Sequence, residues 1–170
     1  MIVSDFQYLQ YQELDSTQNE AIRLIDKSAI PGCTIITADL QTSGYGQYQR
    51  AWKSLSGNLH ITIVAKNKVD MDITKIPLKV ASAITDFCNQ KFATDLFYVK
   101  PINDIYAKHK KIGGILCQQY KGYLLIGIGM NIKHAPKDLP IAISMADIGI
   151  NIDLDYHFIA TLAEKVLSWL

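Results

Sequence analysis

The sequence predicts an α+β domain: a mixed, largely antiparallel β-sheet with helices packed on one side. Segments with strand character outnumber helical ones. Several of these strand segments follow one another with only short turns between them, which favours antiparallel pairing. The helical segments each have one apolar face, as needed to cover a sheet. A length of 170 residues is enough for one domain with a sizeable core.

The first third of the chain predicts three strands and one helix. A strand is expected over residues 8–13. Residues 15–17, Asp-Ser-Thr, are favourable helix caps, and an apolar helix face continues to about Lys27. The β-branched run at 34–38 and the apolar run at 58–65 predict the next two strands.

The middle of the chain predicts a helix followed by a short strand. The helix has Thr74 near its start. A strand over residues 96–100 is expected to end at Pro101, because proline cannot donate to the ladder. Helical spacing predicts a buried stripe on the helix, formed by Leu78, Ala81, Ile84, Cys88 and Phe92.

The last third predicts a hairpin and a final helix. Residues 112–119 and 123–132 form the two arms, and Lys121-Gly122 forms the turn. The second arm is almost wholly apolar, which is typical of a strand buried on both faces. An amphipathic helix starts at about Asp155. Its predicted buried face consists of Ile159, Leu162, Ala163, Val166 and Leu170.

Composition excludes several classes of function. The net charge of +1 gives no electrostatic footprint for nucleic acid or a membrane surface. No apolar run reaches the length of a membrane span, and the N-terminus lacks the pattern of a signal peptide. Cys33, Cys88 and Cys117 are far apart, so neither a disulfide framework nor a zinc site is expected. They predict reduced thiols in a cytoplasmic protein. The four histidines are scattered, so no resident metal site is expected.

The segment from Gln41 to Trp52 is the most informative part of the sequence. Gly44 and Gly46 lie in a polar stretch flanked by aromatic residues, with Arg50 close behind. Such glycines let a backbone approach a ligand closely, and an arginine can bind a phosphate or carboxylate with two parallel hydrogen bonds. By itself the signal is weak, because many surface loops contain Gly-x-Gly.

Two further polar groups interrupt apolar segments. Lys100, Asn103 and Asp104 follow a predicted strand, where they form either a plain turn or a site with a cation, an amide and a carboxylate. Lys111 precedes an apolar strand, so its ammonium group is placed either at the mouth of a site or in solvent. Lys108 and Lys110 are assigned to a solvated turn.

Gly127 and Gly129 lie two residues apart, so they face the same side of the second hairpin arm. Two glycines on one face destabilise a strand unless something packs there. A bound ligand and a close-packed helix are the two explanations. Asn131 lies on the same face at the end of the strand. This pattern is typical of a strand that forms the floor of a binding pocket.

These segments together resemble the catalytic domain of biotin–protein ligases, in the superfamily that also holds lipoate–protein ligases. Five motifs occur in the family's order. They are Asp15-Ser16-Thr17-Gln18, Gln41 to Trp52, Lys100 to Asp104, Lys111 to Leu116, and Gly127 to Asn131. The resemblance implies a fold of the class II aminoacyl-tRNA synthetase and biotin–lipoate ligase type.

The resemblance also implies an activity in two steps. Biotin is activated with ATP and Mg²⁺ to biotinyl-5'-AMP, and the biotinyl group then passes to a lysine of a biotin carboxyl carrier protein domain. Residues 1–170 are interpreted as one catalytic domain, without the N-terminal DNA-binding domain or the small C-terminal β-domain of some members. No nucleic acid or membrane partner is expected, and a homodimer is left open.

Motif matching assigns roles to individual residues. Arg50, Lys111 and Asp104 are the implied catalytic residues. The implied biotin-binding residues are Ser16, Thr17, Gln41, Gly44, Gly46, Lys111, Gly127 and Gly129. The implied ATP and adenylate residues are Arg50, Trp52, Lys100, Asn103, Asp104 and Asn131. Trp52 has a second interpretation as packing at the base of the loop.

The chain departs from the family pattern at several positions. Tyr45 and Gln47 replace arginines, Gln49 replaces a glycine, and Gln18 replaces an asparagine. Two alternatives therefore stay beside the biotin ligase reading. One is a lipoate or octanoate ligase, which uses the same adenylate chemistry. The other is a degenerate, non-catalytic protein that binds biotin.

Overall fold

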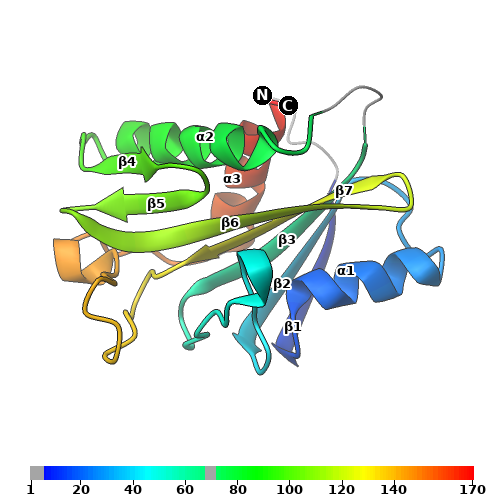
Figure 1. The fold of residues 1–170 in the computed structure, drawn as a ribbon, viewed down its shortest axis with the longest axis horizontal. Coiled ribbons are helices and arrows are strands. Elements are labelled where there is room, and N and C mark those ends of the chain that lie inside the picture. Colours follow the sequence, from blue (N-terminus) through cyan, green and yellow to red (C-terminus); the bar gives the residue numbers. More distant parts are fainter. Residues whose placement is uncertain (1–5, 68–71) are drawn as a thin grey trace.

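The computed structural model describes residues 6–67 and 72–170, and within them a seven-stranded sheet forms the centre of the molecule (Figure 1). The strand order is β1-β2-β3-β7-β6-β5-β4. Only β1 and β2 pair in parallel, so the mixed, largely antiparallel sheet is confirmed. The strands are β1 (Gln7–Leu14), β2 (Thr34–Gln41), β3 (Leu59–Lys66), β4 (Phe97–Lys100), β5 (Asp104–Ala107), β6 (Lys110–Tyr120) and β7 (Tyr123–Met130).

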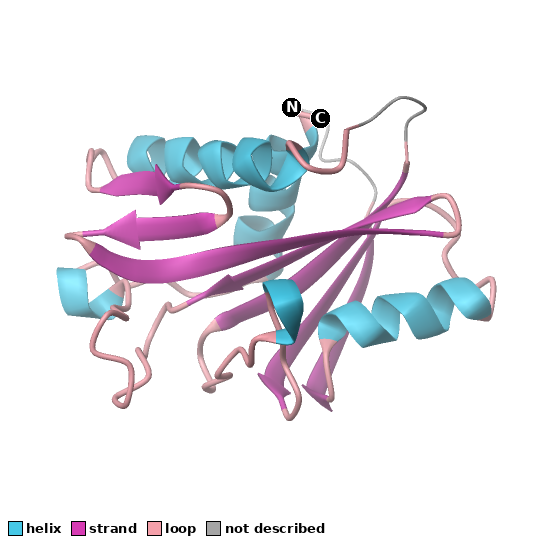
Figure 2. Cartoon of the chain, viewed as in Figure 1, coloured by secondary structure: helices cyan, strands magenta, loops and turns pink. Residues whose placement is uncertain are grey.

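Helices cover both faces of the sheet, not one as expected (Figure 2). Helices α2 (Ile76–Lys91) and α3 (Tyr156–Leu167) pack on one face, and α1 (Thr17–Asp26) packs on the other. Consecutive residues of β3 show why: Ile63 belongs to the core beneath α2, whereas Val64 packs with α1. Val64 of β3 and Leu125 of β7 are fully buried on the α1 side, so this face of the sheet needs a cover as well.

Helix α1 covers only part of its face. It packs mainly on β2, β3 and β7, and it reaches β6 at Tyr120, whose hydroxyl donates to Asp26 at the end of the helix. The loop between β2 and β3, which contains the short 3₁₀ helix η1 (Gln47–Gln49), lies over this remaining part (Figure 1). A space is therefore enclosed between the start of α1, this loop and the central strands.

The helix predictions are largely confirmed. Ser16 caps α1 by accepting a hydrogen bond from the Gln18 amide, and Asp155 caps α3 by accepting one from the Phe158 amide. In α2 the predicted stripe is wrong at Leu78, which is 42% exposed while Val80 is buried. Phe92 follows the end of the helix and is only partly buried. The expected buried residues of α3 lie in the core, with Leu170 only partly buried at its edge.

Strand β5 was missed by the sequence analysis. It forms a hairpin with β6 through Lys108 and His109, which have φ values of 47° and 62°. Positive φ at both turn positions is the geometry of a tight hairpin, and glycine or asparagine is its usual sequence signal. The solvated turn expected at Lys108 is present, but Lys110 is already the first residue of β6, and lysine and histidine at the turn positions do not indicate a tight hairpin.

Other expectations about the chain can be checked among the described residues. Cys33, Cys88 and Cys117 are all free, and burial raises the pKa of the Cys88 thiol to about 12. Within the described ranges, every helix is too short or too polar to cross a bilayer.

Asn58 holds the chain that follows β7. Its side-chain oxygen accepts hydrogen bonds from the amides of Ile132, Lys133 and His134, and its side-chain nitrogen donates to the carbonyl of His134. One buried amide side chain therefore satisfies most of the polar backbone of this bend.

We expect Asn58→Ala to lower the free energy of unfolding by about 3 kcal/mol, because it leaves several backbone amides without acceptors. Urea denaturation measures the change. Asn151→Ala is the matched control, since Asn151 is exposed. A loss below roughly 0.5 kcal/mol, the usual range of surface substitutions, would show that water replaces the side chain without cost.

Candidate active site

A cavity of about 150 Å³ lies between the start of α1, the β2–β3 loop and the strands β3, β7, β6 and β5. Its floor is a row of residues on neighbouring strands. His60 pairs with Gly129, Gly129 with Gly114, and Gly114 with Asp104. Two adjacent glycines in this row leave the backbone bare, which forms a trough across the sheet.

The bare backbone of β7 is covered by two side chains of the protein itself. A Cβ placed on Gly129 would lie 2.6 Å from Cε2 of Trp52, and one placed on Gly127 would lie 2.9 Å from Oε1 of Gln18. The sequence analysis offered a bound ligand or a close-packed helix as the reason for these glycines, and neither is the full explanation. Trp52, which covers Gly129, comes from the loop, and Gln18, which covers Gly127, comes from the start of α1. Both side chains also line the cavity.

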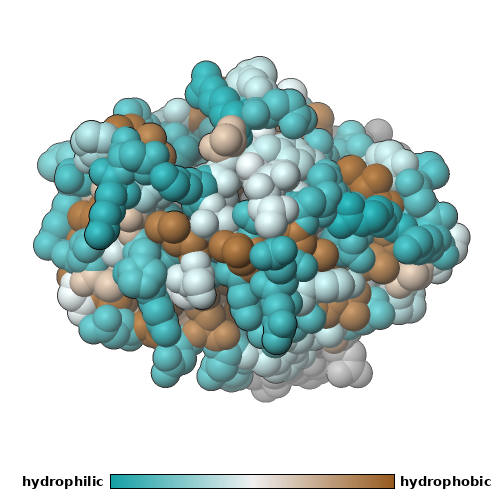
Figure 3. All heavy atoms as spheres, turned by 90° about the horizontal axis from the view of Figure 1, so that it is seen from below, coloured by the Kyte–Doolittle hydropathy of each residue, from teal (hydrophilic) through white to brown (hydrophobic). Residues whose placement is uncertain are grey.

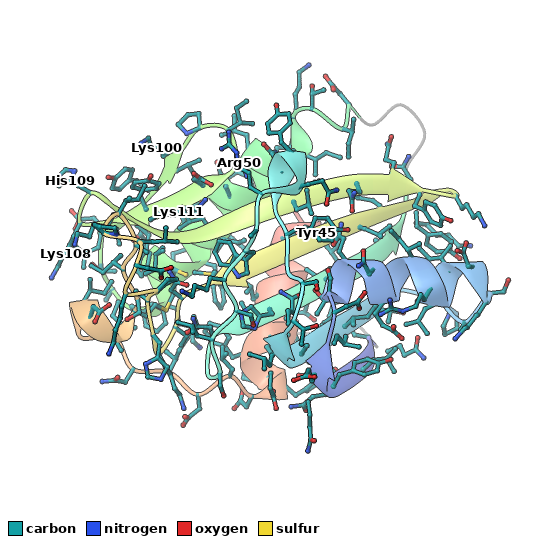
Figure 4. The ribbon with its side chains drawn as sticks, turned by 60° about the horizontal axis from the view of Figure 1, so that its bottom comes forward. Tyr45, Arg50, Lys100, Lys108, His109 and Lys111 are labelled. Atoms are coloured by element: carbon teal, nitrogen blue, oxygen red, sulfur yellow. The ribbon has the colours of Figure 1, made fainter. Side chains whose placement is uncertain are left out.

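One end of the cavity carries an ion pair. Lys111 Nζ lies 2.7 Å from Asp104 Oδ1, with the two side chains 30% and 26% exposed. The same ammonium group lies 5.8 Å from the centre of a Trp52 ring, in the range of a cation–π contact. Lys111 is thus held above the trough, and Lys108 and His109 lie at the outer end of their hairpin (Figure 4).

The other end of the cavity carries uncharged polar groups. The side-chain oxygen of Gln41 accepts hydrogen bonds from the Thr17 amide at 2.8 Å and the Thr17 hydroxyl at 3.2 Å. The Thr62 hydroxyl lies 2.9 Å from Thr17 Oγ1 and 3.0 Å from Gln18 Oε1. The cavity is therefore polarised, with neutral hydrogen-bonding groups at one end and a cation at the other.

His60 belongs to a hydrogen-bonded chain beneath the cavity. Its Nδ1 lies 3.4 Å from the Ala38 carbonyl, which can only accept, so this nitrogen carries the proton. Its Nε2 then accepts from the Ser54 hydroxyl, which in turn accepts from the Gln41 amide. Burial lowers the pKa of the imidazole, so the ring is neutral near pH 7.

The loop over the cavity is fastened to α1 by a residue that departs from the family pattern. The Tyr45 hydroxyl donates to the side chain of Asn19 at 3.0 Å, and Asn19 donates to Asp15. Asp15 also binds Arg23 through both carboxylate oxygens, which holds the pKa of this carboxyl far below its usual range. A tyrosine where arginine was expected therefore anchors the loop through a hydroxyl.

The conformation at Gln49 explains why glycine is expected there. Its φ is 58°, a left-handed conformation that glycine adopts most easily. Tyr48 is also left-handed, with its side chain 84% exposed. Arg50 follows, with its guanidinium carbon 5.8 Å from the centre of the Tyr48 ring. Arg50 lines the cavity and is exposed to solvent.

Most of the predicted site residues meet in this cavity. All three implied catalytic residues line it. The other implied residues that line it are Ser16, Thr17, Gln41, Gly46, Trp52, Asn103, Gly127 and Gly129.

Three predicted residues lie outside the cavity lining. Gly44 packs against the Gln41 side chain, at the base of the loop. Lys100 lies above the Tyr106 ring, 4.8 Å from its centre. Asn131 is buried and donates to the Ile143 carbonyl, so its amide supports the backbone.

The lining also includes four polar residues that were not predicted as site residues: Gln18, Tyr45, Gln47 and His60. Gln18, Tyr45 and Gln47 appeared only as departures from a motif, and His60 only as one of four scattered histidines. The alternation of His60 with Thr62 on β3 was the available signal, because both side chains point to the α1 face.

The surface on the underside of Figure 1 is mainly hydrophilic, with small apolar patches between polar side chains (Figure 3).

The cavity has the features of a site for a small, elongated, anionic ligand. Fold and cavity together define an α+β domain with a polarised cavity over the central strands of its sheet.

Comparison with known proteins gives the family. Residues 11–134 match the model of the biotin/lipoate A/B protein ligase family, and the chain belongs to it. The chain is 32% identical over 144 residues to the bifunctional ligase/repressor BirA of Bacillus subtilis, covering 79% of this chain and 43% of the relative. It is 27% identical over 127 residues to the biotin–[acetyl-CoA-carboxylase] ligase of Mycobacterium tuberculosis, covering 68% and 46%.

A solved structure shows the same fold. The biotin protein ligase of Aquifex aeolicus, in complex with biotin and ATP, is similar with a TM-score of 0.82 and 26% identity. The match covers 96% of this chain and 69% of that chain.

The matches to the relatives from Bacillus subtilis and Mycobacterium tuberculosis each span less than half of the relative's length.

We expect Gly129→Ala to displace Trp52 and destabilise the protein by about 1–3 kcal/mol, because the new methyl group would overlap the indole. Trp52 fluorescence in a Trp169→Phe background, together with thermal unfolding, measures both effects. Gly114→Ala is the matched control, since its Cβ would meet its nearest neighbours at 3.6 Å. Identical spectra for the two variants would contradict the packing of Trp52 on Gly129.

Proposed function

We propose that the chain is the catalytic core of a biotin–protein ligase. It activates biotin with ATP to biotinyl-5'-AMP and transfers the biotinyl group to a lysine of a biotin carboxyl carrier protein domain. The observation that carries the proposal is the polarised cavity, which has neutral hydrogen-bonding groups at one end and Lys111 at the other. Biotin has the same polarity, with a cyclic urea at one end and a carboxylate at the other.

In the first step an oxygen of the biotin carboxylate attacks the α-phosphorus of ATP. The bond from that phosphorus to the oxygen bridging to the β-phosphate breaks, and pyrophosphate leaves. Both reactants are anionic, so cations must lower their repulsion. Lys111 is assigned to the carboxylate and the acyl-phosphate oxygen, and Arg50 to the phosphates. The exposed Arg50 lies on the loop, where it can reach a nucleotide at the mouth of the cavity.

In the second step the neutral amine of the carrier lysine attacks the acyl carbon. The bond from that carbon to the phosphate oxygen breaks, and AMP leaves. Asp104 is assigned to accept a proton from the incoming amine. Its carboxylate contacts Lys111 in this structure, so this role requires that Lys111 turn to the ligand. The loop anchored by Tyr45 would exclude water from the adenylate.

Mg²⁺ fits the donor set as a companion of ATP. Among the described residues, no group of three histidine, cysteine or acidic side chains is arranged to hold a metal ion. Asp104 is the one carboxylate among the residues that line the cavity. One carboxylate plus phosphate oxygens is a common environment for this ion, which would offset phosphate charge.

The free cysteines favour a reducing, cytoplasmic location.

The proposal predicts that biotin stimulates ATP–pyrophosphate exchange by this protein. Lipoate and octanoate are assayed in parallel, because their heads lack the urea that the neutral end of the cavity would bind. Exchange with lipoate or octanoate alone would make the chain a lipoyl or octanoyl ligase. Biotin binding without any exchange would make it a non-catalytic binder.

We expect Lys111→Ala to lower the exchange rate with biotin by about two orders of magnitude or more, as loss of one preorganised donor often does. Lys110→Ala is the matched control, because Lys110 is the exposed neighbour. Far-UV circular dichroism checks that both variants fold. Equal losses from the two variants would point to a diffuse electrostatic effect and contradict the specific role of Lys111.

A further inference from the structure

Gln18 is a buried polar residue to which the proposed function assigns no role. It is 3% exposed, lines the cavity and lies over the bare backbone of Gly127. Its side-chain oxygen accepts from Thr62, but its side-chain nitrogen has no hydrogen-bond partner. An unpaired buried donor is costly, so such a group in a ligand cavity points to a ligand acceptor.

The structure holds Gln18 in place from two sides. Its backbone amide donates to the Ser16 hydroxyl at the start of α1. Its carboxamide oxygen lies 3.0 Å from the Thr62 hydroxyl, and Thr62 is the residue of β3 that pairs with Gly127. The glycine is needed here, because a Cβ at position 127 would lie 2.9 Å from the carboxamide. The side chain is therefore preorganised.

The position of Gln18 identifies the part of the ligand that it would meet. It lies with Thr17 and Gln41 at the neutral end of the cavity, whereas Lys111 and Asp104 lie at the other end. A carboxylate bound by Lys111 places the opposite end of an elongated ligand beside Gln18. A neutral N–H donor at this end fits a carbonyl oxygen.

We propose that Gln18 is a specificity-determining residue whose side-chain nitrogen donates a hydrogen bond to the carbonyl oxygen of a cyclic urea. The inference rests on the proposed function and adds the chemical basis of its substrate choice. A ligand head without an acceptor, such as a dithiolane ring or a plain alkyl chain, leaves the donor unpaired. A site built in this way rejects such heads more strongly than an apolar pocket would.

The test compares biotin with 2-iminobiotin, whose cyclic guanidine is protonated at neutral pH, so that a donating nitrogen replaces the accepting carbonyl oxygen. Calorimetric titration gives the Kd of each ligand for the wild-type chain, Gln18→Met and Gln18→Glu. We expect Gln18→Met to weaken biotin binding by about tenfold, the size of one hydrogen bond, and to leave 2-iminobiotin nearly unchanged. Gln18→Glu exchanges the donor for an acceptor, so we expect it to prefer 2-iminobiotin.

A control variant and two contrary outcomes complete the test. Gln10→Met places the same substitution at an exposed position of β1 and should change neither Kd. If Gln18 had only a structural role, Gln18→Met would weaken the binding of both ligands equally. If both Gln18 variants still bind biotin and keep the wild-type preference between the two ligands, the inference is overturned. If the wild-type chain binds neither ligand and shows no exchange, the proposed function fails as well.

Discussion

The site depends on the absence of side chains at the centre of the sheet. Gly129 of β7 and Gly114 of β6 pair with each other, so two neighbouring strands are bare at the same level. This lets Trp52 lie directly on the backbone and lets the Lys111–Asp104 pair stand beside it. A strand buried between two layers normally presents large apolar residues on both faces. Here one face gives up part of that packing, and the cavity lies at that place.

The cover on this face is divided between two segments of different character. Helix α1 packs through Ala21 and Ile25 on β3 and β7, and it supplies neutral polar groups from its first turn. The β2–β3 loop supplies Trp52 and Arg50, and is fastened to α1 by the contact from Tyr45 to Asn19. In the proposed function, the groups that recognise the ligand therefore lie on a helix, and the groups that act on charge include those of a loop. Functional sites are commonly built on such a combination.

The sequence predicted most elements, because their patterns are local. The caps at Ser16 and Asp155 and the apolar run of β7 are read from neighbouring residues. The errors came from information that is not local. Strand β5 was missed because the turn at Lys108 and His109 is stabilised by its strands and not by its own residues. The predicted roles of Gly127 and Gly129 omitted the side chains over them, which come from segments far away in sequence. Asn131 matched a motif, but its contacts with the Ile143 carbonyl and the Asn58 side chain are visible only in three dimensions.

The one parallel pair in the sheet has a consequence for how the cavity holds together. Strands β1 and β2 run side by side with Leu14 opposite Gln41, so the residues just beyond their ends meet, although 24 positions separate Thr17 from Gln41. Parallel neighbours can meet in this way only through a long crossover, which α1 provides here. Strand β1 is also the outermost strand on its side. The neutral end of the cavity therefore includes residues that follow directly after one of the two edge strands of the sheet. Fraying at that margin would open the recognition site while the charged end, between β5 and β6, stays intact.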